Sequence, residues 1–335
     1  MSKEFNIAIV GATGAVGVEF LRIIQERKLP VKHLILLASA RSVGKEFLFQ
    51  GSTIQVQELT HESFSGVDIA LFSAGSSISK EYALSAISAG AVVVDNSSAF
   101  RMDNEVPLVV PEINASDILK HRGIIANPNC TTAICVMALY PLHLEFGLKR
   151  VFASSYQAVS GTGAKAISEL GGQIEAITKG EAIKKEVYPH QIAFNVLPHV
   201  DSFLASGYTK EEMKLQNEGR KIMHLPDFQA SITCVRVPVY RAHSAAVTAE
   251  FEQPVDLDRA RAAIERFPGV CLRDDVSQNL YPTPLDVSGT DDCQVGRLRK
   301  DCVLENGLSF WVVGDQLLKG AALNAVQIAE KLLQL

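Results

Sequence analysis

The feature that most constrains the fold of this chain is a glycine-rich loop that joins a short apolar run to an amphipathic segment near its start. Residues 6–10 predict a buried strand, the loop reads GATGAVG, and residues 16–25 carry apolar side chains at helical spacing. Gly11, Gly14 and Gly17 allow the backbone to turn sharply and to approach a pyrophosphate, whose charge meets the N–H groups at the helix start. The pattern therefore predicts a dinucleotide-binding loop; the alternative is a tight turn that binds no ligand.

The same alternation of short apolar runs and amphipathic segments continues through the first third of the chain. It is found at residues 33–38, 69–72, 81–89 and 91–95. Strand and helix in this order imply right-handed crossovers and a parallel sheet, as in a Rossmann-type domain. Turn-forming Pro and Asn then become frequent, which predicts a domain boundary close to residue 128.

A second, α+β domain is expected after this boundary. A helix begins at Cys130, and residues 151–158 and 232–238 alternate as half-buried strands. Thr209 and Glu212 have the spacing of a capping box at the start of another helix. The final segment, GDQLLKGAALNAVQIAEKLLQL, predicts one long amphipathic helix that returns to the first domain. The expected fold is α/β, with a Rossmann-type domain over residues 1–128 and 316–335 and an α+β domain over residues 129–315.

Composition narrows the classes of protein further. With 335 residues, 47% of them hydrophobic and 21% charged, the chain can build two cores, so disorder and a small disulfide-stapled scaffold are excluded. The net charge of −5 gives no basic surface for nucleic acid, and no apolar stretch is long enough to span a membrane. The six cysteines form no close C-x-x-C pair and no signal peptide is evident, so we expect reduced thiols, no bound metal and a cytoplasmic location.

The cofactor preference can be predicted from the end of the second expected strand. NAD-dependent enzymes commonly carry a carboxylate there for the ribose hydroxyls, whereas this chain reads LLASARS. Arg41 and Ser42 offer a guanidinium and a hydroxyl, which are suitable donors for a 2′-phosphate. This favours NADP; the alternative is an ordinary solvated arginine.

A nucleophile is predicted at Cys130, which closes the run ANPNC and begins a helix. The helix dipole stabilises a thiolate, and the N–H groups there can hold an oxyanion. A thiolate beside a nicotinamide predicts that the thiolate adds to an aldehyde and that the adduct gives up hydride to leave a thioester. The proton transfer in this mechanism needs a base. His243, in a loop just past the strand that carries Arg236, is the candidate base, although a structural histidine is the alternative. The remaining cysteines are expected to be packing residues, at positions 135, 234, 271, 293 and 302.

Two further groups remain ambiguous from the residues alone. Gln157 and the loop from Ser160 lie at the end of a strand, in SYQAVSGTG. The Gln157 amide could orient an acyl group while the glycines let a ligand come close; the alternative is a polar strand end followed by a flexible turn. Glu211 and Lys214, three residues apart, look like an exposed intrahelical ion pair.

Taken together, GATGAVG, NPNCTTA, SYQAVSGTG, VRVPVYRAHS and GDQLLKGAALNAVQIAEK resemble the aspartate-semialdehyde dehydrogenase family, in order and over essentially the whole chain. The resemblance implies a second domain like that of glyceraldehyde-3-phosphate dehydrogenase, used for catalysis and for a homodimer. It implies that Cys130 is the nucleophile, His243 the general base and Gln157 the residue that positions the substrate. Substrate and phosphate contacts are implied for Arg101, Asn129, Glu211, Lys214 and Arg236. Cofactor contacts are implied for Gly11, Thr13, Gly14, Ala15, Val16, Arg41, Ser42, Ser160, Gly161 and Gln316, the last being Asn in many members.

The implied reaction is NADPH-dependent reductive dephosphorylation of L-4-aspartyl phosphate to L-aspartate 4-semialdehyde, in the biosynthesis of lysine (through diaminopimelate), methionine, threonine and isoleucine. The nearest alternative, N-acetyl-γ-glutamyl-phosphate reductase, typically reads NPGC followed by an aromatic residue and a proline, whereas Asn129 and Thr131 flank Cys130 here. A noncatalytic NADP-binding relative would be expected to lose the thiol or the base. A cysteine hydrolase or acyltransferase, which has no redox step, would not explain the glycine loop.

Overall fold

The computed structural model describes residues 4–334, and the chain divides into two compact units. The first unit runs to Asn129 and resumes at Ala321, and the second unit is Cys130–Gly320. The sequence placed the return to the first domain at Gln316, earlier than Ala321. Gln316 belongs to the second unit because its side chain is hydrogen-bonded to Ser160 and Ala242 there.

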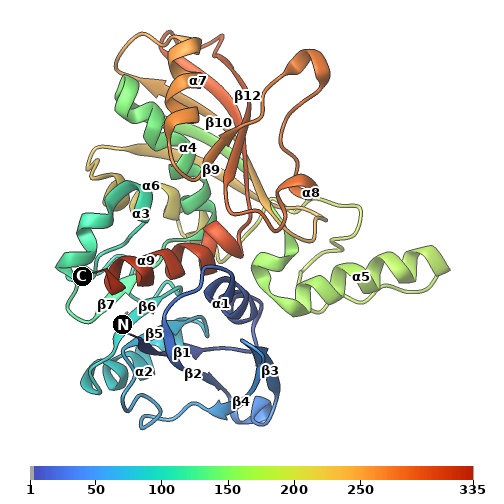
Figure 1. Ribbon diagram of the computed structural model, residues 1–335. Helices are drawn as coiled ribbons and strands as arrows, with labels where there is room; N and C mark the ends of the chain where they lie inside the picture. Colours follow the sequence, from blue (N-terminus) through green and yellow to red (C-terminus); the bar gives the residue numbers. More distant parts are fainter. Residues whose placement is uncertain (1–3, 335) are drawn as a thin grey trace. The chain divides into compact units, whose positions relative to one another are not determined.

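The first unit is a Rossmann-type α/β fold, as the sequence predicted (Figure 1). Within the described residues its sheet has seven strands in the order β3-β4-β2-β1-β5-β6-β7; β3 is antiparallel to β4, and the other pairs are parallel. The strands are β1 (Phe5–Val10), β2 (Val31–Ala38), β3 (Glu46–Phe49), β4 (Ser52–Glu58), β5 (Ile69–Phe72), β6 (Val92–Asp95) and β7 (Ile124–Ala126). The helices are α1 (Ala15–Glu26), α2 (Ser76–Ser88), α3 (Pro111–Asn114) and α9 (Leu323–Leu333), with short 3₁₀ turns at Ala40–Ser42 and Ala115–Lys120.

Helix α9 is the C-terminal segment of the first unit and lies beside α1 (Figure 1). An ion pair joins Arg27, which follows α1, to Glu330 of α9, with 2.7 Å between Nε and Oε1. The expected single long helix is instead a π-helical turn at Leu318–Ala322 followed by α9. Within this turn Gly320 lies against Cys130, as described below.

The second unit is built on a mixed sheet, which within the described residues has six strands in the order β11-β12-β13-β10-β8-β9. The strands are β8 (Leu148–Gln157), β9 (Gln229–Arg236), β10 (His243–Phe251), β11 (Val270–Leu272), β12 (Cys293–Lys300) and β13 (Gly307–Gly314). The helices are α4 (Cys130–Phe146), α5 (Ala164–Lys179), α6 (Lys210–Met223), α7 (Leu257–Arg266) and α8 (Pro284–Val287), with 3₁₀ turns at Val159–Thr162 and Val276–Gln278. Strands β8 and β9 are parallel and β10 is antiparallel to β8, so the ends of β8 and β9 lie at the same sheet edge as the start of β10.

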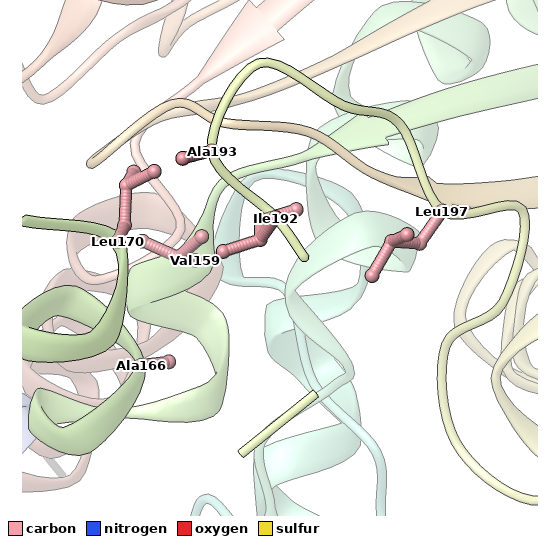
Figure 2. Close-up of a cluster of buried hydrophobic side chains, with 6 residues drawn as sticks. All are labelled: Val159, Ala166, Leu170, Ile192, Ala193 and Leu197. Atoms are coloured by element: carbon pink, nitrogen blue, oxygen red, sulfur yellow. The ribbon is translucent and has the colours of Figure 1, made fainter. Parts of the chain in front are cut away.

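A small buried cluster fixes the turn that follows β8. Val159 packs with Ala166 and Leu170 of α5 and with the segment that carries Ile192 and Leu197 (Figure 2). Because Val159 is the first residue of the 3₁₀ turn Val159–Thr162, the cluster also fixes the neighbouring Ser160 and Gly161. Helix α5 itself extends away from the six-stranded sheet (Figure 1).

Three further findings concern residues 4–334. None of their helices combines the length and the apolar character needed to cross a membrane. No group of three or more His, Cys, Asp or Glu side chains among them is arranged to hold a metal ion. Their six cysteines form no disulfide; Cys135, Cys234 and Cys293 are buried as expected, but Cys271 and Cys302 are exposed, so the prediction that these two pack in a core was wrong.

Candidate active site

The glycine loop of the first unit has the tight geometry that the sequence predicted. Gly11 has φ = +86°, and a Cβ there would lie 3.0 Å from the backbone of Ser73 after β5. A Cβ on Gly17 would come within 2.3 Å of the Gly11 carbonyl oxygen, so α1 can pack on the loop only with glycine at this position. Gly14 caps the N-terminus of α1 without a side-chain hydrogen bond, and Ala15 and Val16 form its first turn. The first turn of α1 therefore presents backbone N–H groups to an anion.

A cavity of about 550 Å³ opens beside this loop within the first unit. Gly11, Thr13 and Gly14 line it together with the exposed Arg41, which lies in the turn after β2. The Thr13 and Ser42 hydroxyl oxygens are 3.4 Å apart. Sequence reasoning missed Glu58, at the end of β4, which lines the same cavity because Ala38 and Glu58 are paired in register. The cavity thus offers the donors suited to a 2′-phosphate and one carboxylate suited to ribose hydroxyls.

Arg101 lies in a buried polar network of the first unit and is only 7% exposed. Its Nε donates to the carbonyl oxygen of Asn127 at 2.8 Å and its Nη2 to that of Asn96 at 2.7 Å. The Asn127 side chain in turn accepts a hydrogen bond of 2.6 Å from Asn324 of α9. The guanidinium is therefore held in one orientation by two segments of this unit, and one of them is joined to α9.

In the second unit, the ends of three strands bring polar side chains to one edge of the sheet. Gln157 ends β8 and is paired in register with Arg236, which ends β9. His243 begins β10, next to the pair Ser244 and Tyr156. The prediction that His243 lies in a loop was wrong: the chain turns back within residues 237–242, and the histidine is already the first residue of the antiparallel strand.

Cys130 begins α4, as the sequence predicted, and is partly exposed. Thr131, the next residue, accepts a hydrogen bond of 2.8 Å from the Gln157 side-chain amide, which joins the start of α4 to the edge of the sheet. Gly320 lies against the thiol-bearing residue: a Cβ at position 320 would be 2.8 Å from Cβ of Cys130. The thiol is thus positioned between a helix N-terminus and the π-helical turn.

His243 is 1% exposed, and its Nδ1 accepts a hydrogen bond of 3.0 Å from the backbone N–H of Ala158. Burial, together with the nearby positive charge of Arg236, holds the pKa of His243 well below its usual 6.5. The ring is therefore neutral at neutral pH, and because Nδ1 is an acceptor its proton lies on Nε2. Nε2 is buried and has no hydrogen-bond partner in the part of the chain that the structure describes, so it is available to a bound molecule.

Arg236 is 5% exposed and is held at the edge of the sheet by its Nη1, which donates to the Ala158 carbonyl oxygen at 2.7 Å. Its guanidinium carbon lies 5.9 Å from the ring centre of Tyr188, a cation–π contact. Its Nε is buried and unpaired within residues 4–334. A Cβ on Gly161 would meet both Nη1 of Arg236 at 3.1 Å and Nε2 of His243 at 3.0 Å, so glycine here leaves room above both groups.

Glu211 and Lys214 do form the intrahelical ion pair that spacing suggested, with 2.7 Å between Oε2 and Nζ. The pair is not an ordinary exposed one, because Glu211 is only 7% exposed and its Oε1 accepts a hydrogen bond of 3.2 Å from Gln157. Lys214 also contacts Asp201 at 3.3 Å. The start of α6 therefore places a buried carboxylate beside Gln157, and a partly exposed ammonium is paired with that carboxylate.

Gln316 uses both ends of its amide within the second unit. Its Oε1 accepts from the Ala242 N–H at 2.7 Å and its Nε2 donates to the Ser160 hydroxyl at 2.5 Å. Sequence reasoning did not anticipate Ala242, nor Asp315, which accepts from Nε of Arg241 at 2.6 Å. No local sequence signal marks these partners, because residues more than seventy positions apart in the chain make the contacts.

The structure thus gathers most of the expected residues into one group in each unit. The group in the first unit comprises Gly11, Thr13, Gly14, Ala15, Val16, Arg41 and Ser42 at the glycine loop. Two expected residues of this unit lie outside that group: Arg101 is in its own network, and Asn129, which is 7% exposed, ends the first of the unit's two segments. The group in the second unit comprises Cys130, Gln157, Ser160, Gly161, Glu211, Lys214, Arg236, His243 and Gln316. The first group is suited to binding an anionic nucleotide, and the second offers a thiol, an imidazole and charges of both signs.

Comparison with known proteins agrees with this chemistry. Residues 6–121 match the family model described as semialdehyde dehydrogenase, NAD binding domain, and residues 139–319 match semialdehyde dehydrogenase, dimerisation domain. The chain is 52% identical to the aspartate-semialdehyde dehydrogenase of Aquifex aeolicus, over 98% of each chain, and 49% identical to that of Bacillus subtilis, over 100% of this chain and 99% of the relative. A solved structure of aspartate semialdehyde dehydrogenase II from Vibrio cholerae, complexed with ASA, superimposes with a TM-score of 0.97 at 45% identity, over 99% of each chain. On the site and on these full-length similarities, the chain belongs to the aspartate-semialdehyde dehydrogenase family.

Proposed function

We propose that this chain is an aspartate-semialdehyde dehydrogenase, which converts L-4-aspartyl phosphate to L-aspartate 4-semialdehyde with NADPH and releases phosphate. The observation that carries the proposal is the partly exposed Cys130 at the start of α4, joined through Thr131 and Gln157 to the sheet edge that holds Arg236 and His243. The reaction supplies a precursor for lysine, methionine, threonine and isoleucine.

Cys130 is the nucleophile. Its thiolate, stabilised by the N-terminus of α4, attacks the acyl carbon of aspartyl phosphate. A carbon–sulfur bond forms, the carbon–oxygen bond to phosphate breaks, and phosphate leaves with its electron pair. NADPH, which the glycine loop of the first unit would hold, would supply the hydride for the thioester carbonyl carbon. When the resulting thiohemiacetal oxyanion collapses, the carbon–sulfur electron pair returns to Cys130 and the aldehyde is released.

His243 acts on the oxygen that becomes negative in both steps. In its resting tautomer Nε2–H is a buried donor, which can stabilise a developing oxyanion by a hydrogen bond. The general-base role that the family resemblance implies needs the proton on Nδ1 instead, since a base must present a lone pair at Nε2. We propose that Nε2 is the atom through which His243 acts in either role.

The charged groups of the second unit match the charges of aspartyl phosphate. We assign Arg236 to the α-carboxylate, because a guanidinium can bind a carboxylate through two parallel hydrogen bonds. We assign Glu211 to the amino group, because it is a buried carboxylate beside Gln157. Gln157 orients the acyl group, and Lys214 contacts phosphate. In the first unit, Arg101 is assigned to phosphate, and Asn129, next to the nucleophile, to the substrate.

We propose NADP as the cofactor, bound in the first unit by the glycine loop with Thr13 and with Arg41 and Ser42 at the 2′-phosphate. The cavity lined by Gly11, Thr13 and Arg41 fits this group. Glu58, which lines the same cavity, gives a like charge that would moderate the preference for NADP over NAD. Ser160 and Gly161, in the turn after β8, and Gln316 are assigned to further cofactor contacts.

We propose that the protein is a cytoplasmic homodimer. A nucleophilic thiol such as Cys130 must stay reduced, which favours the cytoplasm. The dimer is inferred from one face of the second sheet, where β8 alternates between the buried Val151 and Ser155 and the exposed Phe152 and Tyr156. Ala246 and Trp311 continue this face across β10 and β13. An apolar sheet face of this kind suits a second copy of the chain.

The deciding experiment compares aspartate semialdehyde with N-acetyl-glutamate semialdehyde, each with NADP and with or without phosphate. We expect NADPH to form only with aspartate semialdehyde and only when phosphate or arsenate is present. An acetylated amine has no positive charge for Glu211, so the second substrate should fail. Equal rates without phosphate would contradict the acyl-enzyme scheme, and a preference for the acetylated substrate would favour N-acetyl-γ-glutamyl-phosphate reductase.

A further inference from the structure

We propose that Asp315 and Gln316 are positioning residues for His243, because they hold the two residues that precede it, Arg241 and Ala242. Within residues 4–334 neither side chain is hydrogen-bonded to the imidazole, whose Nδ1 accepts from the Ala158 N–H and whose Nε2 has no partner, so both would act through the backbone. The inference rests on the proposed function only for the role of His243 itself. Its geometry lies entirely within the second unit.

Asp315 is the anchor of this arrangement. It is 1% exposed, and its Oδ2 accepts from Nε of Arg241 at 2.6 Å and from the N–H of Gly289 at 2.7 Å. Its Oδ1 accepts from the Leu317 N–H at 2.9 Å. With these three hydrogen bonds the carboxylate fixes Arg241 relative to the turn that follows β13.

Gln316 holds the next residue. The Ala242 N–H donates to its Oε1 at 2.7 Å, and its Nε2 donates to the Ser160 hydroxyl at 2.5 Å. Ser160 lies in the turn beside Gly161, over which the His243 ring is packed. Gln316 therefore connects the residue before β10 to the turn Val159–Thr162, which packs against the imidazole.

Ala242 needs this support because of its backbone conformation. It has φ = +69°, in the left-handed region that a residue with a Cβ rarely adopts, and it is fully buried. Such a conformation persists only where surrounding contacts enforce it. Because Ala242 immediately precedes His243, its backbone angles set the direction from which the histidine enters the site.

Little space surrounds the His243 ring, so a small displacement changes its contacts. Nδ1 is 3.0 Å from the Ala158 backbone nitrogen, and Gly161 leaves no room for a Cβ at Nε2. A shift of about 1 Å in a catalytic group can reduce a rate by about a hundredfold. Loosening Arg241 and Ala242 should therefore lower kcat while the substrate still binds through Arg236 and Glu211.

The test is Asp315→Asn, with Asp274→Asn as the matched control. Asp274 is an equally buried carboxylate of the second unit: it accepts from Arg261 at 2.5 Å and from the Arg297 N–H at 2.6 Å, and it is not part of the proposed site. We expect D315N to lower kcat about tenfold or more relative to D274N, with KM for aspartate semialdehyde changed less than about twofold. An equal kcat in the two variants, or a loss confined to KM, would overturn the proposal.

A second variant tests the role of Ala242 directly. Glycine adopts positive φ readily, so Ala242→Gly should recover part of the kcat lost in D315N. If the double variant is no faster than D315N, the proposed route through Ala242 is wrong. Should D315N fail to fold, Arg241→Lys, which keeps the charge but loses the guanidinium Nε that donates to Asp315, is expected to show the same loss in kcat and the same rescue.

A readout without turnover separates this inference from the proposed function. Long-range ¹H–¹⁵N spectra of histidine-labelled protein report the tautomer of His243. We expect a single Nε2–H form in the wild type and in D274N, and a mixture in D315N. A wild type without phosphate-dependent activity would refute the proposed function, whereas an unchanged His243 signal in D315N would refute its positioning by Asp315.

Discussion

At the scale of single residues, position rather than residue type decides what each cysteine can do. Cys130 is partly exposed at the first position of α4, where the helix dipole favours a thiolate. Cys135 lies further along the same helix and is fully buried, and burial raises its pKa to about 12. Burial and the nearby charge of Glu211 also raise the pKa of the Cys234 thiol. Only the first of the three is suited to attack an acyl group at neutral pH.

The pair Cys130 and Cys135 therefore gives a matched test of the nucleophile. We expect Cys130→Ala to reduce turnover by at least about a thousandfold, because covalent catalysis is lost, while NADPH still binds with unchanged affinity. Cys135→Ala should keep turnover within about threefold and lose about 1 kcal/mol of stability from the small cavity it leaves. Steady-state kinetics and fluorescence titration with NADPH measure both. A Cys130→Ala variant with near wild-type turnover would show that another group attacks the substrate.

The depressed pKa of His243 predicts a change of stability with pH. In the unfolded chain the ring titrates near 6.5, whereas in the folded protein burial and Arg236 keep its pKa well below that value. Below pH 6.5 the unfolded state therefore binds a proton that the folded state does not, and the free energy of unfolding falls as pH falls, by at most ~1.4 kcal/mol per pH unit. Above pH 6.5 the ring is neutral in both states and contributes no slope.

Urea unfolding at several pH values between 5 and 8 tests this prediction in the wild type and in His243→Gln. The variant should lose less stability between pH 6.5 and pH 5, since the other ionisable groups are common to both proteins. The prediction is wrong if the two curves of unfolding free energy against pH run parallel. The same burial predicts that titration of His243 contributes no decline of kcat/KM until well below pH 6.5.

At the scale of secondary-structure elements, the sequence predicted what short-range chemistry determines. The capping box at the start of α6 is present, with the Thr209 N–H 2.7 Å from the Glu212 carboxylate and the Glu212 N–H 3.2 Å from the Thr209 hydroxyl. The glycine loop and the helix at Cys130 were likewise confirmed, because each depends on residues that are neighbours in the chain. The entry of β10 at His243 and the π-helical turn before α9 were not predicted.

Those two features depend on contacts between distant segments. The turn Leu318–Ala322 departs from an α-helix where Gly320 lies against Cys130, nearly two hundred residues earlier in the chain. The start of β10 depends on pairing with both β8 and β13. The family resemblance named Gln316 without showing that its amide binds Ala242 and Ser160, because a side chain's partners follow from the folded backbone. Local pattern alone cannot supply such contacts.

The π-helical turn provides a prediction about Gly320. A Cβ at this position would lie 2.8 Å from Cβ of Cys130 and 3.2 Å from its Cα, so Gly320→Ala must displace either the turn or the start of α4. We expect a loss of about 1–3 kcal/mol of stability from overpacking and a fall in kcat of about tenfold or more, as the thiol moves. Thermal unfolding and steady-state kinetics measure the two effects.

Gly172→Ala is the control for this variant. Gly172 lies within α5, and a Cβ there would meet no atom within 4 Å, so alanine should be neutral or slightly stabilising through its higher helix propensity. If Gly320→Ala behaves like Gly172→Ala in both stability and kcat, the close approach to Cys130 has no consequence for the thiol.

At the scale of the whole molecule, one face of the six-stranded sheet carries exposed aromatic side chains. Phe152 and Tyr156 are 49% and 37% exposed on this face, and the rings of Tyr156 and Trp311 lie 5.3 Å apart. On the same strand, Val151, Ser155 and Gln157 point the other way and are buried, and α4 contacts β8, β10 and β13. A sheet with one face covered by a helix and an aromatic other face is expected where two copies of a chain associate.

The proposed homodimer is tested by Phe152→Lys, with Leu48→Lys as the control. Phe152 is half exposed, so the monomer should tolerate lysine at this position. A dimer would bury the lysine charge, so the dissociation constant of the dimer should rise at least about tenfold relative to the wild type. Leu48 is 72% exposed in β3 of the first unit, where lysine should leave association unchanged. Sedimentation velocity over a concentration series measures both. A wild type that is monomeric at micromolar concentration, or a Phe152→Lys variant that associates like Leu48→Lys, would show that this sheet face does not form the dimer.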